Sequence, residues 1–99
     1  MAKPIPVSFE TAELLAIQAL AFLAQDGERL GRFLELTGLG PDDIRAAAGE
    51  PHFLAAVLDH IAGYEPLLND FVAATNIDPT SIAPARAALG SKDWEREVP

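Results

Sequence analysis

The sequence predicts an all-α protein that folds as a single compact bundle of five to six helices. Apolar residues recur at helical spacing in segments separated by proline, glycine and asparagine, which is the pattern of short, packed helices. β-Branched residues are few and no stretch alternates between polar and apolar residues, so the signals of a strand are absent. The 99 residues are enough for one domain with its own core and too few for two.

The chain divides into three parts by composition. Residues 1–7 contain Pro4 and Pro6, which lack backbone donors and favour extended geometry, so we expect a flexible N-terminal arm. Residues 8–90 carry the helical pattern and are expected to form the single domain. Residues 91–99 are mostly charged and are expected to form a polar C-terminal tail.

The first helix is expected between Ser8, a favourable N-cap, and Ala24. Its apolar residues point almost all round, which is typical of a central helix or of one that a partner chain covers. The same segment is the only one that resembles a secretory signal, but Glu10 and Glu13 stand where a basic region should precede the apolar stretch. No run approaches the roughly 20 apolar residues of a membrane span, so we expect a cytoplasmic protein.

Cap residues place the next two helices. The second is expected from its N-cap Asp26 to Leu36, with Gly38 as a left-handed stop. Its inward face is predicted to hold Leu30, Phe33 and Leu34, with Leu36 as a further candidate. A short third helix is expected to start at Pro41, with two carboxylates in its first turn, and to end at Gly49.

Prolines mark the starts of the remaining helices. The fourth and fifth are expected to run from Pro51 to a stop at Gly63 and from Pro66 to a stop at Asn76. The last segment is expected to begin with a single turn at residues 78–79. Pro84 lies too deep in this segment for an unbroken helix, so a separate short helix is expected over residues 84–89.

Residues 13–49 align with residues 51–87 at an offset of 38 without a gap. The clearest shared phrase is Phe33-Leu34…Thr37-Gly38-Leu39…Pro41…Ile44 against Phe71-Val72…Thr75-Asn76-Ile77…Pro79…Ile82. Each unit is expected to comprise two helices, a left-handed stop and a short proline-started helix. The pattern leaves open a true duplication or a chance similarity of capped helices. Two units are too few for a solenoid, so we expect them to pack against each other in one globule.

The tetrapeptide Ala21-Phe22-Leu23-Ala24 stands upstream of a distinctive phrase. That phrase comprises Asp26, Arg29, Leu30, Phe33, Leu34, Thr37, Gly38, Pro41 and Asp42. With this combination, the chain from about Ser8 to Leu89 resembles a family of short bacterial proteins known as domain of unknown function 3572. The resemblance implies a small, helical, intracellular bacterial protein, and it supplies no activity, ligand or catalytic residue.

Charge and residue usage argue against several function classes. The net charge of −8 repels phosphate backbones and anionic lipids, so neither nucleic acid nor a membrane is an expected partner. The chain has no cysteine, and about 12 Å of helix rise separates His52 from His60, so no metal or cofactor is expected. No serine lies in a nucleophile elbow and no glycine-rich phosphate loop is present, so we do not expect an enzyme.

The basic residues Arg29, Arg32 and Arg45 are concentrated on the expected second and third helices. Glu28 and Glu35 stand at helical spacing from Arg32, which favours ordinary ion pairs on the helix surface. The functional alternative is contact with an anion or with a partner protein. Both interpretations remain open at this point.

Trp94 lies in the polar C-terminal segment, where it belongs either to a loosely docked tail or to an anchor for another chain. We therefore expect a small, acidic, non-catalytic protein–protein interaction module, either an adaptor or a homodimer. Its candidate interaction residues are Arg29, Arg32, Arg45 and Trp94. The alternative hypothesis is a helical domain that binds a small molecule or an anion through one of the three arginines.

Overall fold

The computed structural model describes the chain from Ser8 to Glu97, with the backbone alone for Pro41 and residues 91–97. Its elements are α1 (Phe9–Ala24), α2 (Gly27–Thr37), the 3₁₀ turn η1 (Pro41–Asp43), α3 (Ile44–Ala47), α4 (Pro51–Ala62), α5 (Glu65–Thr75), the 3₁₀ turn η2 (Pro79–Ser81) and α6 (Ile82–Glu97). The described residues contain no strand, and the predicted all-α bundle is confirmed. No helix among them is long and apolar enough to cross a membrane.

Helix α1 is the central helix that the all-round apolar pattern predicted as one alternative. The Ser8 hydroxyl accepts a hydrogen bond from the Thr11 backbone N–H at 3.1 Å and so caps the helix start. One face, rich in alanine, is buried against α4 and α6, because small side chains let helices approach closely. Leu14 and Ile17 stay 64% and 42% exposed on the other face.

Helix α2 starts and ends where its caps predict. The Asp26 carboxylate accepts hydrogen bonds from the backbone N–H groups of Glu28 at 3.0 Å and Arg29 at 3.4 Å, and Gly38 ends the helix with φ of 76°. Phe33 is buried as expected. The expectation for Leu36 is wrong: it is 71% exposed, since it lies about 110° round the helix from the centre of the inward face.

Helix α6 corrects the prediction for the last segment. The single 3₁₀ turn forms, but one continuous helix follows it from Ile82 to Glu97. Pro84 fits because it occupies the first turn, where a backbone N–H would lack an intrahelical partner anyway. The helix also continues beyond Leu89, so the backbone passes through residue 90 without a break.

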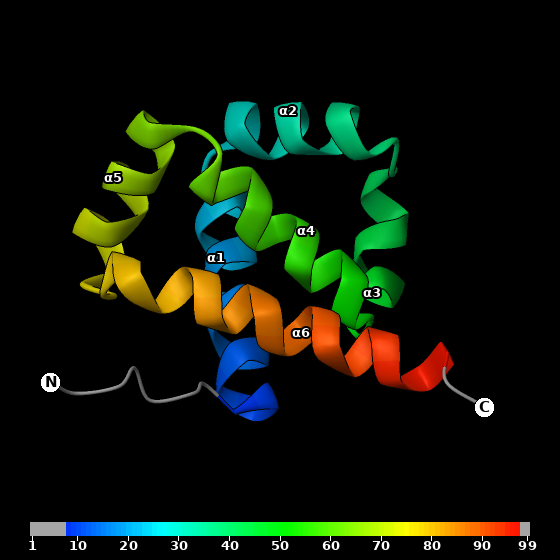
Figure 1. The fold of residues 1–99 in the computed structure, drawn as a ribbon. Helices are drawn as coiled ribbons and strands as arrows, with labels where there is room; N and C mark the ends of the chain where they lie inside the picture. The colour runs from blue at the N-terminus through cyan, green and yellow to red at the C-terminus, as the bar shows by residue number, and fades with distance from the viewer. Residues whose placement is uncertain (1–7, 98–99) are drawn as a thin grey trace, which may run out of the picture.

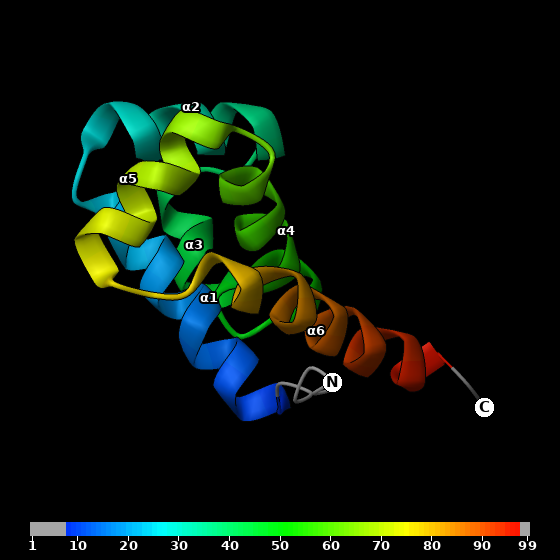
Figure 2. The ribbon, with the colours of Figure 1, turned by 60° about the vertical axis from the view of Figure 1, so that its left-hand side comes forward.

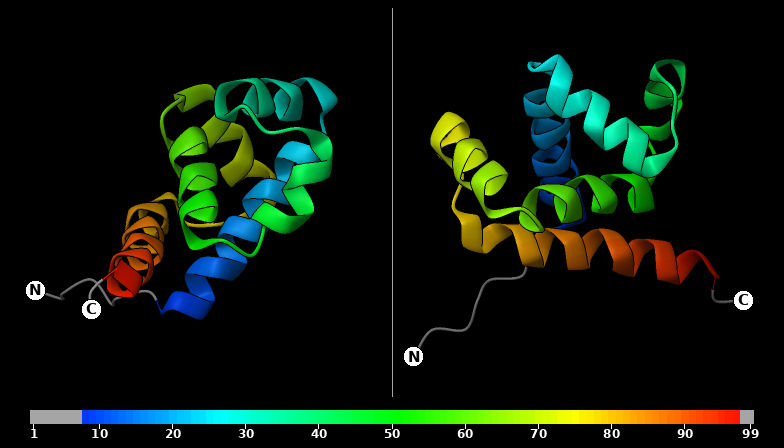
Figure 3. Two further views of the ribbon diagram at one scale, coloured as in Figure 1. Left: turned by 90° about the vertical axis from the view of Figure 1, so that its right-hand side faces the viewer. Right: turned by 90° about the horizontal axis from the view of Figure 1, so that it is seen from above.

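The core lies where α1, α4 and α6 meet. In Figure 1, α6 passes across α1 and alongside α4, while α2 and α5 lie above and beside this centre. Figure 2 shows α2 and α5 together at one end of the molecule. Seen from above in Figure 3, α4 runs between α2 and α6. The largest fully buried side chains are Phe33, Phe71, Leu23, Leu54, Leu58, Ile61, Leu89 and Val57.

The two units of the sequence repeat have matching element bounds. Shifted by 38 residues, α2 coincides with α5, η1 with η2, and the end of α1 with the end of α4. The left-handed stops Gly38 and Asn76 also coincide, with φ of 76° and 60°. In both units a threonine hydroxyl, of Thr37 or Thr75, donates to the carbonyl four residues earlier, at 3.0 and 2.7 Å. The units therefore share their local structure as well as their sequence pattern.

Candidate binding groove between α2 and the α4–α5 corner

An open groove of about 760 Å³ lies between α2 and the corner where α4 turns into α5. It is lined by Asp26, Glu28, Arg29, Arg32, Leu36, Asp59, His60, Gly63, Tyr64, Pro66, Leu67 and Asp70. The lining combines charged groups with exposed apolar side chains. Two of the four predicted interaction residues, Arg29 and Arg32, are brought together here, so this groove is the candidate functional site.

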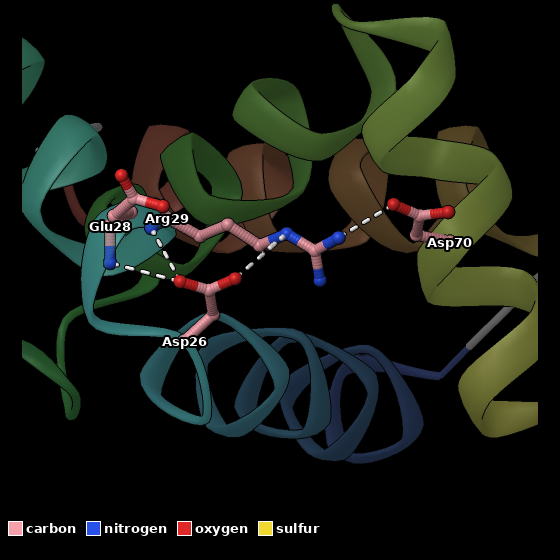
Figure 4. Close-up of polar contacts among 4 residues, drawn as sticks. All are labelled: Asp26, Glu28, Arg29 and Asp70. Atoms are coloured by element: carbon pink, nitrogen blue, oxygen red, sulfur yellow. Dashed lines mark hydrogen bonds and ion pairs between the residues drawn. The ribbon is translucent and has the colours of Figure 1, made fainter.

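Arg29 holds the two sides of the groove together. Its guanidinium donates to the Asp70 carboxylate at 2.6 Å and lies 3.8 Å from the Asp26 carboxylate. Figure 4 shows this side chain reaching from α2 across to α5. The guanidinium also lies 4.9 Å from the ring centroid of Phe22, which adds a cation–π contact. Arg29 is therefore engaged in joining elements of the fold.

Arg32 has a different environment. It lies one helical turn after Arg29, its side chain is exposed, and it lines the groove. Among the described side chains, no ion pair joins it to Glu28, to Glu35 or to another carboxylate. The surface pairing that the spacing favoured is thus not seen at Arg32, which lines the groove without an ion pair among the described side chains.

His60 joins the groove to the core. Its half-buried ring meets the buried Phe33 ring edge to face, with centroids 5.1 Å apart. Burial lowers the pKa of His60 below its ordinary value, and the positive charge of Arg32 lowers it further. The imidazole is therefore neutral at pH 7, and it contributes a hydrogen-bonding edge to the groove without adding charge.

Leu36 and Tyr64 form the apolar rim of the groove, at 71% and 54% exposure. Neither was singled out as an interaction residue from the sequence. An unusual residue at a helix start could have pointed to Tyr64. It occupies the N-cap of α5 without a side-chain cap bond, whereas small polar residues are preferred at that position.

A second ion pair closes the edge of the groove near α6. The Arg86 guanidinium donates a hydrogen bond to the Asp59 carboxylate, which also raises the pKa of Arg86. Of the four arginines with described side chains, Arg29 and Arg86 are therefore paired, whereas Arg32 and Arg45 have no ion pair.

The other two predicted interaction residues lie away from this site. Arg45 is exposed on α3 and is not part of the groove lining. Trp94 belongs to α6, for which the structure describes only the backbone at this position. The structure therefore selects Arg29 and Arg32 from the predicted set and adds His60, Leu36 and Tyr64.

The histidines do not converge on a shared site. His52 is exposed in the first turn of α4, and His60 lies two turns later against Phe33. The described part of the chain brings together no group of three or more histidines, aspartates and glutamates suited to a metal ion. The groups that line the groove are the arginines and carboxylates, the His60 imidazole and the exposed side chains of Leu36 and Tyr64.

Fold and groove together define a small all-α protein with an open groove lined by polar and apolar side chains. The model of the family described as a protein of unknown function (DUF3572) matches residues 9–92. The chain belongs to this family, as the sequence resemblance indicated. Comparisons with curated proteins and with solved structures give no match.

Proposed function

We propose that the protein is a small, non-catalytic, cytoplasmic module that binds a protein partner in the groove between α2 and the α4–α5 corner. The observation that carries the proposal is the grouping of exposed Leu36, exposed Tyr64 and unpaired Arg32 in one groove. A cytoplasmic location is supported by α1, whose apolar residues pack in the core of the fold.

Tyr64 and Arg32 of the groove are of the residue types that are typical of protein-binding hot spots. Tyrosine and arginine are enriched among the residues that dominate binding energy at interfaces. Burial of exposed apolar surface contributes about 25 cal/mol per Å², and Leu36 and Tyr64 supply such surface. Buried ring contacts, of Phe22 with Phe71 and of His60 with Phe33, pack the two sides of the groove together, and the Arg29–Asp70 pair adds a further link. The groove therefore has its shape before a partner arrives, and little ordering is needed on binding.

Self-association is the weaker form of the proposal. One ground for the homodimer hypothesis was the apolar first helix, and its Leu15, Phe22 and Leu23 are buried within the same chain. The large apolar side chains that remain exposed on α1 are Leu14 and Ile17, and unlike Leu36 and Tyr64 they do not line the groove. An adaptor that binds a different protein is therefore favoured.

Binding of a small molecule or anion is the second candidate, because Arg32 lies beside neutral His60 in a groove of suitable volume, about 760 Å³. Such a ligand would raise the melting temperature of the isolated protein in proportion to the logarithm of its concentration.

The test is a quantitative affinity capture from cells that produce the protein. The wild type is compared with the double variant Leu36→Ser/Tyr64→Ala and with Leu14→Ser, a control that changes a leucine of similar exposure on α1, 64% against 71% for Leu36. We expect a stoichiometric partner that the wild type and the α1 variant retain and the groove variant loses. Equal capture by all three folded proteins would contradict the proposal.

A further inference from the structure

The two repeated units face each other through reciprocal ring contacts. Phe22 of the first unit packs on Phe71 of the second, with centroids 5.4 Å apart and an interplanar angle of 63°. His60 of the second unit packs on Phe33 of the first, at 5.1 Å and 62°. A shift of 38 residues converts Phe22 to His60 and Phe33 to Phe71. The two contacts are therefore the same contact with the units exchanged.

Such an exchange is the signature of a twofold relation, as in an isologous dimer. Here the relation is internal and links the α1–α2 pair to the α4–α5 pair. The groove is lined by α2 and its N-cap from the first unit and by the α4–α5 pair from the second, so it lies where the two units face each other. Positions on one side of the groove accordingly have counterparts on the other.

The counterpart of the Arg29–Asp70 ion pair explains why Arg32 has no partner. Under the same shift, Arg29 corresponds to Leu67 and Arg32 to Asp70. On one side of the groove the aspartate of the pair meets an arginine at 2.6 Å. On the other side Arg32 holds the position of the aspartate, and the opposite position is a leucine, which carries no charge. Leucine is also shorter than arginine, so it leaves room beside Arg32.

We propose that the partner supplies the missing anion: a carboxylate of an acidic protein segment binds Arg32 beside Leu67, and an adjacent apolar side chain of that segment covers Leu36 and Tyr64. This inference rests on the proposed function and specifies the partner's chemistry. A guanidinium forms strong, bidentate hydrogen bonds with a carboxylate. The rim exposed at Leu36 and Tyr64 gives the same segment an apolar contact one or two residues away.

Three of the four carboxylates that line the groove already face an arginine. The carboxylates of Asp26 and Asp70 face Arg29, and the carboxylate of Asp59 faces Arg86. Glu28, four residues before Arg32, lines the groove as well and competes for its guanidinium. The net charge of −8 opposes the approach of an acidic segment, and salt screens this repulsion over about 8 Å at physiological ionic strength.

The test is a selection of random twelve-residue peptides, displayed on phage, against the full chain. We expect the selected peptides to carry Asp or Glu next to an aromatic or aliphatic residue. Arg32→Gln should weaken their binding about tenfold or more, and Glu28→Gln should strengthen it because the competing carboxylate is gone. Arg45→Gln, at an exposed arginine outside the groove, is the matched control and should leave binding unchanged.

The outcomes separate this inference from the proposed function. Peptides that lack a carboxylate but still require Leu36 and Tyr64 would overturn the acidic partner and leave the groove as a binding site. Peptides insensitive to every groove variant, or no selected peptide at all, would count against both. Binding of inorganic phosphate or acetate at Arg32 with affinity equal to that of the peptides would overturn the protein segment in favour of a small anion.

Discussion

The imidazole of His60 contacts the buried core and also lines the groove, so its pKa depends on both environments. One side of the ring packs on buried Phe33, and Arg32 lies close enough to lower its pKa. In the unfolded chain the same group titrates near its ordinary value of about 6.5. The folded protein therefore binds fewer protons than the unfolded chain as the pH falls below that value.

Stability should accordingly decrease as the pH falls through about 6.5. Burial comes first among the causes of the lowered pKa, so protonation of His60 disfavours the folded state. We expect the urea midpoint of the wild type to drop more between pH 7.5 and 5.5 than that of His60→Gln. Carboxylates that titrate at lower pH are common to both proteins and cancel in the comparison. An identical drop in the two proteins would contradict this account of His60.

Phe71 and Leu36 differ in burial, so their replacement by alanine should change the free energy of unfolding by different amounts. Phe71 is fully buried and packs on Phe22, so Phe71→Ala should cost about 3–5 kcal/mol of the free energy of unfolding. Leu36 is 71% exposed, and Leu36→Ala should change it by less than about 0.5 kcal/mol. Chemical denaturation of both variants measures the difference. A cost above 2 kcal/mol for Leu36→Ala, in the range of core substitutions, would show that it is not a rim residue.

Helical periodicity correctly predicted that Phe33 lies in the core. It fails at Leu36, since being apolar does not decide which face of a helix a residue occupies. Arg32 shows a different limit. Its spacing to Glu28 and Glu35 favoured an ion pair that the described side chains do not form, because exposed pairs are worth little and spacing alone does not decide whether one forms.

At the scale of elements, the glycine inside α2, Gly31, and the glycine that ends this helix, Gly38, should respond in opposite directions to replacement by alanine. Gly31 lies inside the helix, and an added Cβ would meet nothing within 4 Å, so Gly31→Ala should stabilise the protein by about 0.5–1 kcal/mol. Gly38 has φ of 76°, which costs a non-glycine residue about 1 kcal/mol or more. Gly38→Ala should therefore destabilise it. Thermal unfolding of the two variants would refute this assignment of the helix end if both shifts had the same sign.

Helix boundaries were predictable because capping chemistry is local. Asp26, Gly38, Pro51 and Asn76 each act on the backbone within one turn, and the structure has a helix end at each of them. The error at Pro84 arose from the position at which helix α6 starts. A shift of the start to Ile82 moves the proline into the first turn, where it is tolerated.

At the scale of the whole molecule, the groove depends on contacts that sequence spacing does not reveal. Arg29 was a candidate from the sequence, but its partner Asp70 lies 41 residues further along the chain. The sequence repeat showed which residues of the α1–α2 unit correspond to which residues of the α4–α5 unit. It did not reveal how the two units face each other, and so the grouping of Arg32, His60 and Tyr64 became visible only in the folded chain.

The central claim, that the groove binds a protein partner, is tested most directly by photocrosslinking in living cells. A photoreactive p-benzoylphenylalanine replaces Leu36 in one protein and Glu10 in another. Glu10 is exposed in the first turn of α1, at the opposite end of that helix from α2 (Figure 1). The account predicts one crosslinked protein from position 36 and none from position 10. The same products from both positions, or products from position 10 alone, would contradict it.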